Sequence, residues 1–468
     1  MISSHQALSD TVISNGYCVG CGACAVPEQS PFKMVMDSYG QYRPHTNDSP
    51  VFARTDSSYE KLCPFSASAP NEDDIAKQYY ADNCEHHPQA GYYKGVYVGH
   101  VAEDEFRTRG SSGGMGTWVL HELLDKNRVD YVIHVKSETA DKDLHNIPFT
   151  YQVSGTLDEV RQGGKSRYYP IELSQVLKTV RDQPGRYALV GVPCFIKSVR
   201  LLQAQDPILA ERIKYCVGLV CGHLKSAHYA ESLAWQMGIP PSELEAIDFR
   251  IKDPTQPANR YSTYAKGSSG EKVVPTNNLF GADWGAGTFK YKACDFCDDV
   301  FAETADVVLG DAWLPEHVQD SYGTNVVITR NNDIQQLIEN ARSDGRLALD
   351  DLSIEKAVQS QDAGLRHRKI SIGYRLHCEE KANAWIPTKR IKPARTLNPR
   401  YEMKRQRLRS ELRDLSHQSF LAAKKSGDLS VYTSAMTPVY NRYLLQKRSL
   451  LSRVYFLVKK RLKAMIGR

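Results

Sequence analysis

The chain has 468 residues, of which 41% are apolar and 24% are charged, and its formal net charge is +6. This composition is ordinary for a soluble globular protein that is long enough for two or three domains. No apolar run approaches the ~20 residues needed to cross a bilayer, and Met1–Ser14 lacks the basic start and apolar stretch of a secretory signal. We therefore expect a cytoplasmic protein in a reducing compartment.

The net charge hides an asymmetry along the chain. Residues 390–468 contain 20 Lys and Arg against 4 Asp and Glu, whereas residues 1–389 contain 40 against 50. The sequence thus predicts an acidic body with a basic C-terminal extension over 346–468. Within it, apolar residues recur at helical spacing from Tyr440 to Ile466. A basic amphipathic helix of this kind suits an anionic membrane surface or the acidic body of its own chain. Nucleic acid is the weaker alternative, because no recognition motif accompanies the charge.

The first 70 residues read as a small, loop-rich domain that contains four cysteines and buries too little apolar surface to fold unaided. A bound metal cluster would supply the missing stabilisation. Residues 71–91 are polar and acidic, and we expect a linker there.

From residue 92 to residue 345, strand-like and helical segments alternate, which predicts a mixed α/β domain. The expected strands are 95–101, 131–135, 186–190, 215–220, 306–309 and 325–329. The expected helices are 171–180, 226–237 and 333–341, with another beginning near Thr117.

Eleven cysteines, an odd and crowded set, point to metal or redox chemistry rather than disulfides in a reducing compartment. The sharpest motif is Cys18-Val-Gly-Cys21-Gly-Ala-Cys24, in which one short loop offers three corners of a cuboidal [4Fe–4S] cluster. Cys63, followed by Pro64, is the natural fourth ligand. Structural zinc is the alternative, but zinc usually draws two ligands from each of two knuckles.

A second group of cysteines is dispersed along the chain. Cys294 and Cys297 form a C-x2-C pair, and Cys194 and Cys221 follow expected strands, where ligands collect in α/β sheets. Together they predict a second cluster, although each alone is as readily a buried apolar side chain. Cys216 falls in mid-strand and should pack in the core, and we expect structural roles for Cys84 and Cys378.

Glycine- and serine-rich turns offer sites for an anionic cofactor. Free amides at a helix N-terminus receive an anion, and glycine allows close approach. Neither a Walker P-loop nor a Rossmann fingerprint is present, and a solvated loop is the alternative for each turn. The residues expected to bind the cofactor are Arg109, Ser111, Ser112, Gly113, Gly114, Gly164, Lys165 and Ser166.

These motifs, in their order along residues 10–345, resemble the coenzyme F420 hydrogenase/dehydrogenase beta-subunit family, which includes the 7-hydroxymethyl chlorophyll a reductases. Besides the two cysteine motifs, the resemblance rests on Gly191-Val-Pro-Cys194, Gly218-Leu-Val-Cys221-Gly222, Phe249-Arg-Ile-Lys-Asp253 and Ala305-Asp-Val-Val-Leu-Gly-Asp311. The sequence departs from the pattern of this family at two points. Phe65 follows Cys63-Pro64 where glycine is commoner. The residues of the turn around Lys165 stand in a different order, which puts the role of that lysine in doubt.

The resemblance implies a ferredoxin-like [4Fe–4S] domain over 1–70 and an α/β domain over 92–345 that holds FAD and a second [4Fe–4S] cluster. It implies electron transfer between a ferredoxin-type or coenzyme F420-type carrier and a substrate. Relatives with long C-terminal extensions are often bacterial and encoded among polysaccharide-synthesis genes, which suggests a sugar-linked or lipid-linked substrate.

Three hypotheses follow. The first is an iron–sulfur flavin-dependent oxidoreductase, and the second is a non-catalytic electron-transfer subunit of a larger redox complex. The third is a zinc-stabilised protein that its tail recruits to membranes. No catalytic acid is assigned, since His223 beside Cys221 is more readily a core or surface histidine than a proton donor. The oligomeric state is not predicted.

Overall fold

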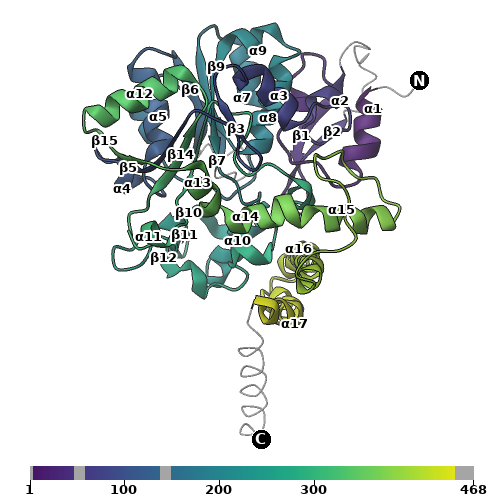
Figure 1. Cartoon of the computed structure of the whole chain (residues 1–468). Helices are drawn as coiled ribbons and strands as arrows, with labels where there is room; N and C mark the ends of the chain where they lie inside the picture. Colours follow the sequence, from purple (N-terminus) through teal and green to yellow (C-terminus); the bar gives the residue numbers. More distant parts are fainter. Residues whose placement is uncertain (1–3, 47–57, 138–148, 448–468) are drawn as a thin grey trace, which may run out of the picture.

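The computed structural model describes residues 4–46, 58–137 and 149–447 and centres on a mixed sheet of eight strands (Figure 1). In spatial order these are β15 (Leu347–Asp351), β5 (Gly95–Val101), β14 (Asn325–Thr329), β13 (Val307–Asp311), β9 (Ile213–Leu219), β8 (Tyr187–Gly191), β6 (Tyr131–Ser137) and β7 (Phe149–Ser154). Strands β13, β9, β8 and β6 are parallel, and the other pairings are antiparallel. The predicted mixed sheet and its expected strands are confirmed.

Helices cover both faces of this sheet, because successive strand residues point to opposite sides. In β9, Cys216 packs in the apolar cluster of one face and Val217 in that of the other. Helices α7 (Ser174–Asp182) and α8 (Pro193–Gln203) cover the first face, and α5 (Met115–Asp125) and α12 (Asn332–Ser343) cover the second. Shorter helices connect these elements: α4 (Phe106–Arg109), α6 (Leu157–Arg161), α9 (Pro207–Arg212) and α11 (Pro315–Val318).

The expected helices are present, with one instructive difference at the start of α7. The sequence predicts a helix from Ile171, but α7 begins at Ser174. The amide of Leu173 donates instead to the carbonyl of Cys21, at 2.9 Å. Residues 171–173 therefore lie outside the helix, and this bond joins them to the N-terminal cysteine loop.

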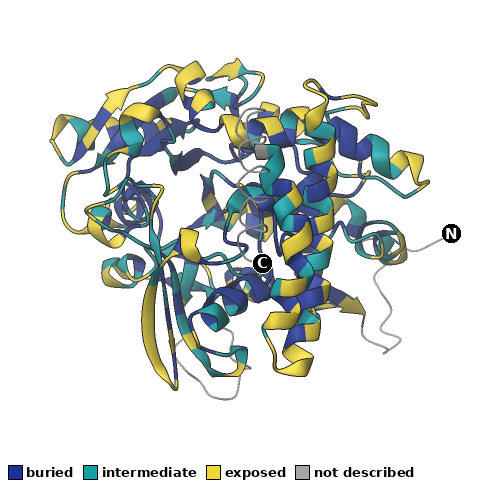
Figure 2. Ribbon diagram, turned by 90° about the horizontal axis from the view of Figure 1, so that it is seen from below, coloured by how far each residue is buried: buried dark blue, intermediate teal, exposed yellow. Residues whose placement is uncertain are grey.

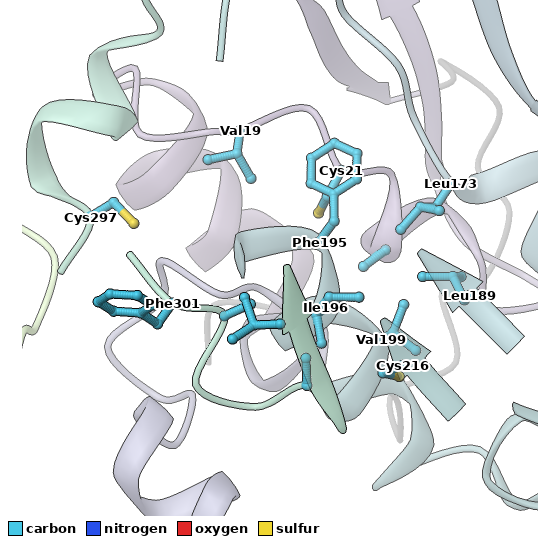
Figure 3. Close-up of a cluster of buried hydrophobic side chains, with 14 of the residues drawn as sticks. Val19, Cys21, Leu173, Leu189, Phe195, Ile196, Val199, Cys216, Cys297 and Phe301 are labelled. Atoms are coloured by element: carbon cyan, nitrogen blue, oxygen red, sulfur yellow. The ribbon is translucent and has the colours of Figure 1, made fainter. Parts of the chain in front are cut away.

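The N-terminal segment packs directly on the sheet domain. It contains α1 (Ser4–Leu8), the π-helical turn η1 (Ser9–Ile13), the 3-10 turn η2 (Ala23–Ala25), the hairpin β1 (Phe32–Met36) and β2 (Tyr42–Thr46), and α2 (Tyr59–Leu62). Val19 and Cys21 share one apolar cluster with Leu189 and Phe195 of the sheet layer (Figure 3). The cysteine loop is thus joined to the larger domain by a continuous core.

The expected linker forms ordered structure. Helix α3 (Glu72–Tyr80) begins at Asn71, whose side chain accepts from two backbone amides of the first turn in a reciprocal capping box. The strands β3 (Glu85–His87) and β4 (Gly91–Tyr93) follow as a hairpin. Buried Glu72 pairs with Lys197 of α8 at 3.1 Å. Residues 71–91 are therefore packed on the body rather than being a free connection.

A second, three-stranded antiparallel sheet lies below the first in Figure 1 and is formed by β10 (Leu244–Ile251), β11 (Ser262–Gly267) and β12 (Gly270–Pro275). It shares a third apolar cluster with α10 (Ala227–Gln236), α16 (Tyr401–Ser426) and α17 (Ser430–Lys447). Short 3-10 turns complete this region: η3 (Pro241–Glu243), η4 (Thr276–Asn278), η5 (Trp284–Ala286) and η6 (Lys292–Phe296).

The described part of the C-terminal extension is largely helical. It comprises α13 (Ile354–Ser360), α14 (Asp362–Leu365), the π-helical turn η7 (Arg366–Ile370) and α15 (Ile372–Lys381), followed by α16 and α17. These helices turn one face to the interior and expose the other (Figure 2). Tyr443 is buried, and Tyr440 and Leu444 pack on the third cluster. The rest of the predicted amphipathic segment, 448–468, lies outside the described residues. Among the helices that are described, none is long and apolar enough to span a membrane.

Candidate functional site

The first cysteine group lies on a loop that curls through two left-handed glycines. Gly20 and Gly22 have φ values of +71° and +82°, and a Cβ on Gly22 would lie 2.3 Å from a carboxylate oxygen of Glu172. Cys24 is in η2, and Cys63 immediately follows α2. Glycine is required at position 22 because any side chain would strain the left-handed backbone and collide with the start of α7.

The four thiols of this group, Cys18, Cys21, Cys24 and Cys63, lie within electrostatic reach of one another. Burial raises the pKa of Cys24 well above its usual value, and the other three sulfurs raise it further. Burial likewise raises the pKa of Cys21, to about 12. Buried thiols of this kind stay protonated unless a cation replaces the proton, and iron or zinc does so on binding.

The second group brings together cysteines from three distant segments. Cys194 is in the first turn of α8, directly after β8, Cys221 follows β9, and Cys294 and Cys297 lie in and just after η6. Burial raises the pKa of Cys194, and Cys297, Cys221 and Cys294 raise it further, in that order. The fold thus places the four dispersed cysteines, which the sequence proposed as one set, in mutual range.

The two groups are neighbours. Cys21 of the first group also raises the pKa of Cys194 in the second, and Cys21 and Cys297 belong to the same apolar cluster (Figure 3). Cys216, by contrast, is fully buried in mid-strand beside Arg200 and Asp306, as expected for a core residue.

No three Cys, His, Asp or Glu side chains among the described residues converge on a point where they could hold one metal ion. In a [4Fe–4S] cluster each cysteine binds through its own thiolate, so the cluster itself separates the four sulfurs. Two sets of four buried thiols in mutual electrostatic range fit such a group by their chemistry.

A cavity of about 300 Å³ adjoins the second group, and Cys221 is part of its wall. Six of the eight residues expected to bind the cofactor line it, namely Ser111, Ser112, Gly114, Gly164, Lys165 and Ser166. The Ser166 amide donates to Oγ of Ser111 at 2.8 Å, which ties the two glycine-rich turns together. Lys165 pairs with Asp248 at 3.2 Å.

Two of the expected cofactor residues lie elsewhere. Arg109 is exposed, pairs with Glu105 at 2.6 Å and lines a second cavity that shares Gly110, Thr117 and Gly164 with the first. Gly113 lines neither cavity. A Cβ on Gly113 would lie 2.7 Å from Oδ1 of Asn325 and 2.9 Å from the carbonyl of Gly99, so its role is close packing against the sheet.

Further residues line the cavity wall, and two of them, Lys225 and Trp284, were not singled out from the sequence. The rings of His223 and Trp284 stack with centroids 4.3 Å apart, and Lys225 lies over the Trp284 ring at 4.9 Å. Arg250 is held by a bidentate pair with Asp311, at 2.8 and 3.2 Å. These contacts join residues that are distant in the sequence, so spacing along the chain does not predict them. The pair of basic residues at Arg250 and Lys252 was the local pattern that pointed to an anion at this wall.

Unpaired donors face this cavity. Nε of Arg167, Nε of Arg250 and Nε2 of His223 are buried and have no hydrogen-bond partner in the part of the chain that the structure describes, and all three residues line the wall. Burial lowers the pKa of His223 well below its usual value, and Lys225 lowers it further. A flat aromatic ligand that carries acceptor atoms and an anionic tail, such as a flavin nucleotide, fits these donors and the aromatic wall.

The C-terminal extension closes over the second cysteine group from outside the sheet domain. Asp295, between Cys294 and Cys297, is buried and pairs with Arg413 of α16 at 2.6 Å. Asp298 pairs with Arg390 at 3.2 Å. Arg390 and Arg413 of the basic extension are therefore paired with aspartates of the acidic body.

The chain is similar in sequence to known proteins over more than half of its length. Residues 96–178 match the N-terminal domain, and residues 185–355 the C-terminal domain, of the beta subunit of coenzyme F420 hydrogenase/dehydrogenase. A coenzyme F420-dependent sulfite reductase from Methanocaldococcus jannaschii is 22% identical over 343 residues, which are 70% of this chain and 47% of that protein. The chain thus spans about half the length of this curated relative. A chain of the F420-reducing [NiFe] hydrogenase complex from Methanosarcina barkeri aligns with a TM-score of 0.49 and 14% identity, covering 64% of this chain and 98% of its own.

Proposed function

Because the chain belongs to the coenzyme F420 hydrogenase/dehydrogenase beta-subunit family, we propose that it is an iron–sulfur flavoprotein oxidoreductase. In this proposal Cys18, Cys21, Cys24 and Cys63 hold one [4Fe–4S] cluster, and Cys194, Cys221, Cys294 and Cys297 hold another. FAD occupies the cavity beside Cys221. When bound, the clusters carry single electrons and the flavin accepts one or two, which couples a one-electron carrier to a two-electron substrate.

The observation that carries the proposal is the continuity of these three sites. Cys194 lies within electrostatic reach of Cys21 on one side and of Cys221 on the other, and Cys221 is part of the cavity wall. An inert packing role for the cysteines would give no reason for two groups of four to lie next to each other and for one of them to adjoin a cavity.

In this proposal, different residues of the cavity wall bind different parts of the flavin nucleotide. The two glycine-rich turns, joined by Ser111 and Ser166, offer amides and hydroxyls to the anionic part of the nucleotide. Trp284 and Tyr168 supply an aromatic wall, and the unpaired donors of Arg167, Arg250 and His223 are placed for ring or phosphate acceptors.

The carrier that we propose is of the ferredoxin or deazaflavin type, since the sulfite reductase relative is named as dependent on coenzyme F420. The substrate is left to experiment, and a sugar-linked substrate of polysaccharide synthesis stays a prediction.

One observation favours a second function. The match covers 47% of the sulfite reductase, so half of that enzyme has no counterpart in the match. The chain would then be an electron-transfer subunit that relays electrons to a catalytic partner.

Anaerobic purification with metal and flavin analysis tests the proposal. We expect a brown protein with about eight irons and one FAD per chain, whose flavin is bleached by reduced ferredoxin or reduced coenzyme F420. A colourless protein that contains only zinc would contradict it. Bleaching of the flavin without turnover of any added substrate would favour the subunit function.

A further inference from the structure

Arg368 is a buried cation that contacts sulfurs of the second cysteine group. It lies in η7, beyond residue 355, where the family match ends. Its side chain is 2% exposed. One terminal nitrogen donates to Sγ of Cys297 at 3.0 Å, and the other lies 3.7 Å from Sγ of Cys221.

The guanidinium also bonds to the backbone on both sides of the group. The carbonyl of Asp299 accepts from Nη1, and the carbonyl of Gly222 accepts from Nη2 at 2.6 Å. These four contacts fix the planar group between the Cys221 loop and the Cys294–Cys297 knuckle. Such fixed, multiply bonded geometry is what distinguishes arginine from lysine.

The charge of Arg368 lies between two segments of the group. Its guanidinium contacts the sulfur of Cys297 in one segment and that of Cys221 in the other. Among the described residues, no other side-chain cation hydrogen-bonds to a sulfur of either group. In the first group, Arg43 bonds to the backbone carbonyl of Cys18 instead, at 3.2 Å.

A cluster held by four thiolates carries a net negative charge that grows when the cluster takes an electron. In a buried, low-dielectric site the added charge is costly, and a fixed cation or a hydrogen bond to sulfur offsets part of that cost. The offset favours the reduced form and therefore raises the reduction potential.

We propose that Arg368, supplied by the C-terminal extension, is a positioning residue that raises the reduction potential of the second cluster above that of the first. The inference rests on the proposed function, because it requires both clusters. It assigns the segment after the family domain an electronic role.

Stepwise anaerobic reduction of the full-length protein, followed by electron paramagnetic resonance, tests this proposal. Cys194→Ser removes the second cluster and identifies the signal of the first. In Arg368→Gln we expect at least a tenfold loss in the equilibrium constant for reducing the second cluster, which is 59 mV for one electron, with the first unchanged. In Arg368→Lys, which keeps the charge, we expect most of the potential to be restored.

Lys369→Met is the matched control. Lys369 is the next residue, is also largely buried, and pairs with Glu303 at 2.9 Å without bonding to a cysteine. Its removal should leave both potentials in place. An unchanged second potential in Arg368→Gln, or an equal shift in Lys369→Met, would overturn the proposal.

If the Arg368→Gln variant does not retain the second cluster, its potential cannot be measured, and the Arg368→Lys variant then distinguishes the role of the charge from a structural role. If Arg368→Lys retains the cluster at the wild-type potential, the role of the charge is supported. If both variants lose the cluster, Arg368 only holds the two segments together, and the proposal is overturned. A wild-type protein without iron defeats the proposed function and this inference together. An iron-loaded protein with insensitive potentials defeats the inference alone.

Discussion

The two cysteine groups are built in opposite ways. The first has three cysteines on one seven-residue loop and the fourth at Cys63, all within the N-terminal segment. The second has its cysteines just after β8 and β9 and at η6, and Arg368, Arg390 and Arg413 of the C-terminal extension enclose it. A local group depends on the conformation of a loop, whereas a dispersed group depends on the whole fold and on buried charge.

The largest expected effect comes from removing one cysteine of one group, which should remove one cluster and leave the other. Cys297→Ser should reduce the iron content from about eight to about four per chain, because one missing thiolate opens the second cluster and leaves the first loop intact. Iron analysis and spectra measure this outcome. Cys216→Ser, at a buried cysteine outside both groups, should retain the full iron content, and iron loss there would break the assignment.

The next effect concerns the charges around the second group. Burial alone would raise the pKa of Asp295, but Lys290, His367, Arg413 and Arg375 hold it well below its usual value. Asp295→Asn leaves these cations uncompensated, and we expect a loss of about 3–5 kcal/mol in the free energy of unfolding, measured in urea. Asp414→Asn, at an exposed partner of Arg413, should cost less than ~1 kcal/mol. Equal costs would show that enclosure by buried pairs is unimportant.

The cavity beside the second group should give the protein a pH-dependent stability. Burial, with a smaller contribution from Lys136, lowers the pKa of His134 to about 4. The folded state therefore excludes a proton that the unfolded state binds below its ordinary pKa of ~6.5. The stabilisation is present above that value and is lost as the pH falls toward 4.

We expect the wild type to lose up to about 3 kcal/mol relative to His134→Met between pH 6.5 and pH 4. Urea unfolding of both proteins across this range measures the difference. A constant difference between the two would mean that His134 titrates normally in the folded state.

The smallest expected effect is on cofactor affinity. Lys165 lines the cavity and pairs with Asp248 at 3.2 Å, so Lys165→Met removes a positive charge near the proposed nucleotide. We expect FAD binding to weaken about tenfold, or ~1.4 kcal/mol, in a titration of the flavin-free protein. Exposed Lys214→Met is the control, and equal weakening in both variants would rule out a local contact.

The contrast also explains what could be predicted from the sequence. The mixed sheet followed from strand and helix periodicity, and the first group from spacing alone, because both are local patterns. The second group was proposed as one set of four dispersed cysteines, but spacing along the chain gave no evidence that they meet, and the fold places them within electrostatic range of one another. Arg368 could not be foreseen, since a lone arginine in a basic extension carries no signal of burial.

Arg390 and Arg413 show the limit of charge counting. The sum over residues 390–468 treats each cation as available to a partner, but these two are neutralised by buried aspartates of the same chain. The prediction of the cofactor site from the glycine-rich turns was similarly incomplete. Residues of these turns line the cavity, but His223, Arg250 and Trp284 of its wall come from segments more than 50 residues away from either turn.

The continuous apolar core that joins the Cys21 loop to the sheet layer has a kinetic consequence. Segments that share one close-packed interior do not swing apart to meet a donor and then return. Electrons would cross between the two groups by tunnelling through a fixed medium, and the rate of that internal step should not respond to solvent viscosity.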